Sequence, residues 1–226
     1  MLQLINTSDG SHTIKNLELN ETYHSTHGAL QESNHVYIQQ GLHYFINQFQ
    51  PKSANILEVG FGTGLNALLT MIDKKANGIE IIYHTVEAFP LSDDMVKQLN
   101  YPDHLPQINA ASSFLELHKA AWDEEVKLNA NFALHKMLTD IRSLELKEDF
   151  YDVVYFDAFA PKIQPAMWTK SVLANVIRAM RKGGVMVTYC ANGQFKRDLK
   201  DLGMLVEEVP GPPGKRVMVR TYRLRN

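Results

Sequence analysis

One stretch decides the fold of this chain: Asn55-Ile56-Leu57-Glu58-Val59-Gly60-Phe61-Gly62-Thr63-Gly64-Leu65-Asn66. It begins as a short apolar run, turns through three glycines spaced two apart, and continues into residues 67–72, which have the pattern of a helix. Open α/β sheets hold nucleotide-like cofactors with a strand, a glycine-rich turn and a helix in this order. Glycines let the backbone approach the ligand, and the helix start offers unpaired N–H groups. We therefore predict a doubly wound α/β fold with a cofactor at this turn.

Two residues of this stretch narrow the choice of cofactor. The dinucleotide pattern needs a small residue at position 65, where this chain has Leu65. Glu58 would repel a pyrophosphate but suits the ammonium group of a methionine moiety. The pattern E-x-G-x-G-x-G resembles the first motif of class I S-adenosylmethionine-dependent methyltransferases.

Composition excludes several classes of protein. The 226 residues are 45% hydrophobic, which is ample for one core. There is no apolar run of about 18 residues and no signal-like amino terminus, so we expect a cytoplasmic protein with no membrane contact. The single cysteine, Cys190, excludes an intrachain disulfide and a cysteine-rich metal site, and we predict no metal.

Charge is distributed unevenly along the chain. The net charge is −2, but residues 1–173 contain 12 Lys and Arg against 21 Asp and Glu, whereas residues 174–226 contain 11 against 4. The basic carboxy-terminal part indicates a polyanionic partner, or a solvated basic face that balances an acidic one.

We predict an amino-terminal appendage over residues 1–50 and a main domain over residues 51–226. Residues 2–16 alternate around Asp9-Gly10, a hairpin signal. A polar and aromatic loop (21–37) leads into a helix predicted over about 34–49, and this loop is either a lid or a plain surface loop. Its histidines His24, His27 and His35 lack the spacing of a metal site.

Acidic residues follow three of the predicted strands. Glu87 ends a strand over 79–87 and suits the hydroxyls of a ribose. Residues 122–138 have the pattern of a hairpin. Asp140 follows it and could cap a short helix, accept from an adenine amino group, or do both. The strand 151–156 delivers Asp157 to the cofactor crevice, because the first and fourth strands of such a sheet are neighbours.

The remaining chain completes a seven-stranded sheet. We predict a helix over about 170–182 that stops at Gly183-Gly184, a strand over 185–190 and a helix from Phe195 to Leu202. An antiparallel pair over 204–209 and 216–224 closes the sheet. The predicted fold class is therefore an α/β class I methyltransferase, with a Rossmann-like seven-stranded sheet, a carboxy-terminal antiparallel hairpin and a small amino-terminal β appendage.

Several segments together resemble one family, the tRNA 5-methylaminomethyl-2-thiouridine methyltransferases, known as MnmD when free-standing and as the amino-terminal half of MnmC when fused to an FAD-dependent oxidoreductase. The resemblance covers nearly the whole chain. It depends on the glycine stretch and on the segments 23–37, Thr139-Asp140-Ile141, 156–168 and Gly214-Lys215-Arg216. Gln31, Ser33 and Ala166 depart from the family pattern, which leaves substrate details open. We expect no FAD-dependent oxidoreductase domain in this chain.

The resemblance implies methylation of the exocyclic amine of 5-aminomethyl(-2-thio)uridine at tRNA position 34, with S-adenosyl-L-methionine as cofactor and the anticodon stem-loop as partner. The implied catalytic residue is Asp157, which would orient the lone pair of the amine. The expected cofactor-binding residues are Glu58, Gly60, Phe61, Gly62, Gly64, Asn66, Glu87, Asp140 and Asp157. The expected substrate-binding residues are Phe159 and Trp168 at the base, and Lys196, Arg197, Lys215 and Arg216 at the phosphates.

Two other functions stay open from the sequence. A small-molecule amine methyl- or aminopropyltransferase also places an amine beside a sulfonium and a strand-end acid, but a basic carboxy-terminal region suits a cationic polyamine poorly. A non-catalytic tRNA-binding module is the second, and the presence of Glu58, Glu87 and Asp157 argues against it.

Overall fold

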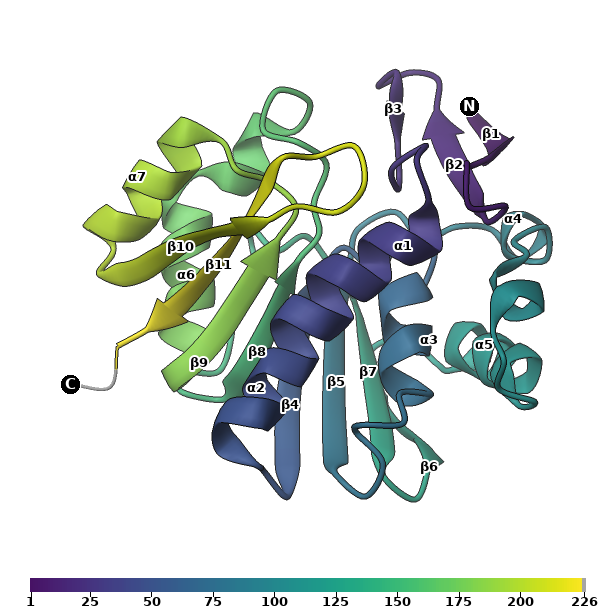
Figure 1. Ribbon diagram of the computed structural model, residues 1–226, viewed down its shortest axis with the longest axis horizontal. Helices are drawn as coiled ribbons and strands as arrows, with labels where there is room; N and C mark the ends of the chain where they lie inside the picture. Colours follow the sequence, from purple (N-terminus) through teal and green to yellow (C-terminus); the bar gives the residue numbers. More distant parts are fainter. Residues whose placement is uncertain (225–226) are drawn as a thin grey trace.

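The computed structural model describes residues 1–224 and contains one large mixed sheet (Figure 1). Its strand order is β10-β11-β9-β8-β4-β5-β7-β6. The five central strands are parallel: β7 (Phe132–Leu138), β5 (Glu80–Glu87), β4 (Ser53–Val59), β8 (Tyr151–Phe156) and β9 (Met180–Thr188). By chain order these strands run 3-2-1-4-5, the order of a doubly wound sheet, and the order reverses between β4 and β8.

Antiparallel strands complete both edges of this sheet. At one edge β10 (Met204–Pro210) pairs with β11 (Val217–Arg223), which in turn pairs with β9. At the other edge β6 (Glu125–Asn129) pairs with β7. The predicted class and its closing hairpin are confirmed, and β6 makes the sheet eight-stranded rather than seven-stranded.

Helices cover both faces of the sheet (Figure 1). One face packs against α3 (Leu65–Met71), α5 (Ala110–Lys119) and a continuous helix formed by α1 (Ala29–Ser33), η1 (Asn34–His43) and α2 (Tyr44–Phe49). The other face packs against α6 (Lys170–Ala179) and α7 (Gly193–Asp201). Because side chains alternate along a strand, Ile56 joins the first core and Leu57 the second.

A small second sheet lies near the ends of the parallel strands, at the upper right of Figure 1. It contains β1 (Leu2–Asn6), β2 (His12–Asn16) and β3 (Glu21–Thr22), and β1 and β2 form the predicted hairpin. The short elements α4 (Asp93–Val96), η2 (Tyr101–His104) and η3 (Pro165–Trp168) lie in connections. The His12 amide donates to Asn100 Oδ1 at 2.7 Å, which ties the small sheet to the main domain.

Three predicted elements differ in the structure. The first helix begins at Ala29 rather than near 34, and its middle part has π-helical geometry. Residues 141–143 form a turn instead of a short helix, because Arg142 pairs with Asp140 and no helix continues the chain. The helix over 170–182 ends at Ala179, since Met180 already pairs with Tyr151, and the two glycines lie in a bulge within β9.

Candidate active site

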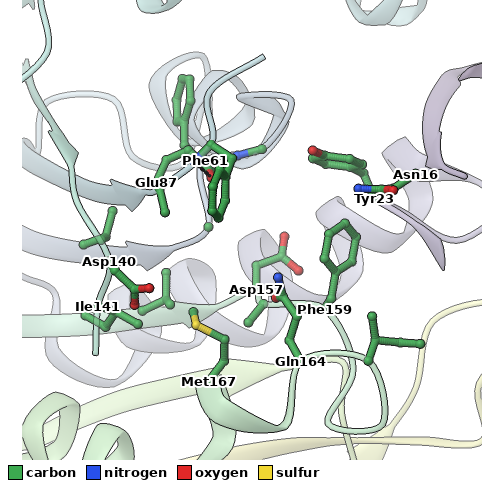
Figure 2. Close-up of a pocket in the computed structure, with 18 of the residues that line it drawn as sticks. Asn16, Tyr23, Phe61, Glu87, Asp140, Ile141, Asp157, Phe159, Gln164 and Met167 are labelled. Carbon is green, nitrogen blue, oxygen red and sulfur yellow. Dashed lines mark hydrogen bonds between the residues drawn. The ribbon is translucent and has the colours of Figure 1, made fainter. Parts of the chain in front are cut away.

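A cavity of about 590 Å³ lies at the carboxyl ends of β4, β5 and β8, where a doubly wound sheet binds its ligand. One part is lined by the glycine turn and by residues that follow β5 and β7. The other part is lined by the small amino-terminal sheet and by the loop that follows β8 (Figure 2). The predicted residues that line the cavity are Gly60, Phe61, Gly62, Asn66, Glu87, Asp140, Asp157 and Phe159.

The glycine turn needs its glycines for close approach. Gly60 has φ +96°, and a Cβ there would lie 2.7 Å from the carbonyl oxygen of Asp157. Gly62 has φ +51°, and a Cβ there would lie 3.2 Å from the Tyr23 ring. The turn therefore packs against both the β8 end and the amino-terminal appendage, and it keeps the cavity open between them.

Glu87 ends β5 and turns its carboxylate toward the glycine turn. Its Oε2 accepts from the Gly62 amide at 3.0 Å, and its Oε1 accepts from the Phe89 amide at 2.8 Å. A carboxylate has about four acceptor positions, so two remain for hydroxyl donors from a ligand. Glu87 therefore keeps acceptor positions beside the cavity, and its role as a ribose-binding acid stays a prediction.

Asp140 lines the same part of the cavity but does not cap a helix. Its Oδ2 accepts from Arg142 Nε at 2.9 Å, and the Arg142 amide donates to its Oδ1 at 2.9 Å. The guanidinium hydrogen bond holds the pKa of Asp140 below its ordinary value, so the side chain is a carboxylate acceptor. Of the two expected roles, helix capping is therefore wrong.

Asp157 lies between the two parts of the cavity (Figure 2), and two donors hold its carboxylate. Tyr37 Oη donates to Oδ1 at 2.5 Å, and Asn66 Nδ2 donates to Oδ2 at 2.8 Å. The pKa of Asp157 is raised to about 7, chiefly by burial and also by the nearby Glu32, although the hydrogen bonds from Tyr37 and Asn66 lower it. A carboxyl group with this pKa can switch protonation state near neutral pH, as a general base does.

The expected contact between Glu58 and the methionine ammonium is wrong. The Glu58 side chain is fully buried, does not line the cavity, and accepts from Thr85 Oγ1 at 2.8 Å. Burial raises the pKa of Glu58 well above its ordinary value. Gly64 also lies outside the cavity lining and begins α3 in the left-handed conformation.

Aromatic side chains form the wall beyond Asp157. The rings of Tyr23 and Phe159 meet edge to face with centroids 5.1 Å apart. The expected contact of Trp168 with the substrate base is wrong, because the residue is only 6% exposed and its ring packs against Phe156 and Phe195. Its Nε1 donates to the Phe159 carbonyl at 2.7 Å, so Trp168 holds the loop that presents Phe159.

The four side chains predicted to contact phosphates differ in whether their charges are already paired within the protein. Lys215 Nζ donates to the buried Glu32 Oε1 at 2.6 Å and lies 3.7 Å from the centroid of the Tyr189 ring. Lys196 forms an ion pair with Glu208. Arg197 and Arg216 are exposed, and Arg197 bonds only Gln194 among the described residues. The two arginines are therefore the better candidates for a polyanion.

Sequence reasoning missed two side chains that position this site. Tyr37 was noted only as part of a resembling segment, although its hydroxyl bonds Asp157. His24 Nε2 lies 2.7 Å from Thr63 Oγ1 and thus links the amino-terminal loop to the glycine turn. Burial lowers the pKa of His24 to about 4, so this link is neutral. Within residues 1–224, no cluster of His, Cys, Asp and Glu is arranged to hold a metal ion.

None of the helices within residues 1–224 combines the length and the apolar character that crossing a bilayer requires.

Comparisons with known proteins match this architecture. A family model described as S-adenosyl-L-methionine-dependent methyltransferase matches residues 108–223. A protein of Aeromonas salmonicida, named tRNA 5-methylaminomethyl-2-thiouridine biosynthesis bifunctional protein MnmC, is 28% identical over 92% of this chain and 33% of its own length. Its Leptospira interrogans namesake is 29% identical over 89% of this chain and 32% of its own length. The chain thus spans about a third of the length of these relatives.

Solved structures show the same fold. The crystal structure of MNMC2 from Aquifex aeolicus superposes with a TM-score of 0.83 at 22% identity, covering 98% of this chain and 70% of that one. A spermidine synthase from Thermotoga maritima superposes with a TM-score of 0.54 at 13% identity, covering 99% and 73%. Both comparisons concern the fold alone.

Proposed function

Because this chain belongs to the S-adenosyl-L-methionine-dependent methyltransferase family, we propose that it methylates the exocyclic amine of 5-aminomethyl(-2-thio)uridine at position 34 of tRNA. The main support is the similarity along 92% of the chain to a relative whose name states the biosynthesis of the methylaminomethyl nucleoside. Since about two thirds of that relative lies outside the match, the proposal covers only the methyl transfer. A tRNA substrate implies a cytoplasmic location.

The cavity fits S-adenosylmethionine by the chemistry of its walls. Glu87 keeps free acceptor positions for two ribose hydroxyls, and Phe89 and Ile141 offer apolar surfaces to a purine. The glycine turn leaves space where a Cβ at Gly62 would approach the opposite wall. S-adenosylmethionine, when bound, supplies a methyl group activated by its sulfonium.

Asp157 is the residue that would act on the amine. A primary alkyl amine is mostly protonated at neutral pH, since the pKa of lysine is about 10.4. The Asp157 carboxylate can accept a hydrogen bond from the amine nitrogen and orient its remaining lone pair toward the methyl group. Methyl transfer would form an N–C bond and break the S–C bond, and the proton that the nitrogen loses would leave through Asp157 or solvent. Because both Asp157 oxygens are already fixed by Tyr37 and Asn66, the acceptor is held in one orientation.

The acceptor part of the cavity can take a flat base. Tyr23 and Phe159 present aromatic surfaces beside Asp157, and base stacking on such rings is worth about 1–3 kcal/mol. The wobble base would have to leave the anticodon stack to enter this part of the cavity. We propose that residues 1–50 provide the wall over this part, with Asn16 and Tyr23 lining it.

The function can be tested with labelled S-adenosylmethionine and two preparations of the same tRNA, one with a free aminomethyl group and one with that amine acetylated. Label should enter only the free amine. Equal labelling of both preparations would place the reaction elsewhere on the tRNA, and transfer to free polyamines but not to tRNA would favour a small-molecule amine as the substrate.

A further inference from the structure

We propose that the side-chain amide of Gln164 binds the Watson–Crick edge of the base whose amine is methylated. This inference rests on the proposed function and names the group that recognises the substrate base. Neither the glycine turn nor the acids assigned above explain how a pyrimidine ring would be held in one orientation beside Asp157.

Gln164 lies in the loop between Asp157 and η3 and lines the same cavity as Asp157. Figure 2 shows its side chain extending into the cavity toward the Asp157 carboxylate. The side chain is half-buried, and its amide has no hydrogen-bond partner among residues 1–224. A half-buried amide without a protein partner is available to a ligand.

The loop keeps its shape without using this amide. The backbone N–H of Gln164 donates to the Ala160 carbonyl at 3.0 Å, and the Met167 amide donates to the Gln164 carbonyl at 3.1 Å. Trp168 and Tyr189 bond the Phe159 and Ala158 carbonyls at 2.7 and 2.9 Å. The loop is therefore fixed by hydrogen bonds to its main chain, and these bonds do not use the Gln164 side chain.

The chemistry of the base fits this placement. In a 5-aminomethyl uracil the reacting arm is attached at C5, so O4 is the nearest edge atom and N3–H follows it. Gln164 lies beside Asp157 on the cavity wall. In the pose that we propose, the amine reaches Asp157 and these two groups face Gln164. A glutamine amide has one donor and one acceptor side by side, so it can donate to O4 and accept from N3–H. Tyr23 and Phe159 would then contact the flat faces of the ring.

The first experiment removes the amide without changing the length of the side chain. Gln164→Met should lower kcat/KM for an anticodon stem-loop RNA bearing 5-aminomethyl-2-thiouridine by about 10- to 100-fold, the scale of losing two hydrogen bonds. Affinity for S-adenosylmethionine and the melting temperature should stay unchanged. Gln48→Met is the matched control, because Gln48 is exposed on α2 and makes no side-chain bond to residues 1–224. Unchanged kinetics of a folded Gln164→Met enzyme would overturn the inference.

A second substrate shows whether the amide and the base edge touch. Methylation of N3 in the same RNA should lower kcat/KM of the wild-type enzyme at least tenfold, but should add little to the defect of Gln164→Met, since the shared contact is already lost. If the two losses multiply, Gln164 does not contact this edge and the inference fails while the function stands. If the wild-type enzyme methylates neither RNA, the proposed function fails and the inference falls with it.

Discussion

The hydroxyl of Tyr37 donates a 2.5 Å hydrogen bond to Oδ1 of Asp157, 120 positions further along the chain. Burial, with the nearby Asp157 charge, raises the pKa of Tyr37 well above its ordinary value, so the hydroxyl remains a donor at neutral pH. The bond fixes one carboxylate oxygen and lowers the pKa of Asp157, which burial raises, so that the net value is about 7. Tyr37 is therefore a positioning residue that also sets the pH at which Asp157 becomes a carboxylate.

Replacing Tyr37 with Phe should slow methyl transfer roughly tenfold at pH 7 and move the acid limb of the kcat/KM profile to higher pH by about one pH unit. The reason is that a hydrogen bond to a charged group contributes about 1.5–3 kcal/mol, and its loss favours protonated Asp157. Rate profiles between pH 6 and 9 would show this shift. Tyr151→Phe is the control, since its hydroxyl bonds His84 away from the cavity. A slower variant with an unmoved profile would leave Tyr37 a purely structural role.

Asp157→Asn should stabilise the protein at alkaline pH and not in acid. The pKa of Asp157 is about 7 in the folded chain against an ordinary 3.8, so the folded state binds more protons in this interval and wild-type stability falls as pH rises through it. The variant has no titratable group at this position, so its stability does not fall in this way. Its gain in free energy of unfolding should grow from near zero at pH 4 to about 1–3 kcal/mol at pH 8. The full pKa shift would correspond to about 4 kcal/mol, but the side chain is partly exposed and solvent reduces the effect. Urea denaturation at both pH values measures it, and a gain that is equal at both would refute the raised pKa.

Gly62→Val should abolish S-adenosylmethionine binding, seen in calorimetry as a loss of affinity of at least about 100-fold. The backbone has φ +51° and the new side chain would press on Tyr23 across the cavity. Gly78→Val is the matched control, because Gly78 has φ +84° with no atom within 4 Å of an added Cβ. If both variants lose affinity equally, backbone strain and not cavity space is responsible.

The two exposed arginines should contact tRNA phosphates. Arg197→Ala and Arg216→Ala should each reduce the slope of log affinity against log salt by about one, without changing turnover at saturating tRNA. Lys52→Ala is the control, since Lys52 precedes β4 at the opposite end of the parallel strands. Filter binding between 50 and 200 mM salt measures the slopes, and slopes equal to that of the wild type would place the tRNA on another surface.

Much of the fold followed from local patterns. Apolar runs that end in Glu87 and Asp157 predicted two strands and two cavity acids, because parallel strands deliver their carboxyl ends to one edge. The Asp-Gly hairpin was equally local.

The side that a residue faces was harder to predict. Glu58 was judged by its position in a motif, but the alternation along β4 turns it into the core beside Thr85. Trp168 ends η3, a helix of four residues, which is too short for its periodicity to show which way a ring points. Contacts between distant segments had no local signal at all, as with Tyr37 and Asp157 or with Lys215 and Glu32.

The most direct test of the account is mass analysis of nucleosides from tRNA that bears 5-aminomethyl-2-thiouridine, after incubation with S-adenosylmethionine and either the wild-type protein or Asp157→Asn. The wild type should convert the wobble nucleoside to its methylaminomethyl form. The variant should do so at least about 100-fold more slowly, while binding S-adenosylmethionine within a few-fold of the wild type. The account would be contradicted if folded wild-type protein that binds S-adenosylmethionine formed no methylaminomethyl nucleoside. Conversion by Asp157→Asn at the wild-type rate would also contradict it.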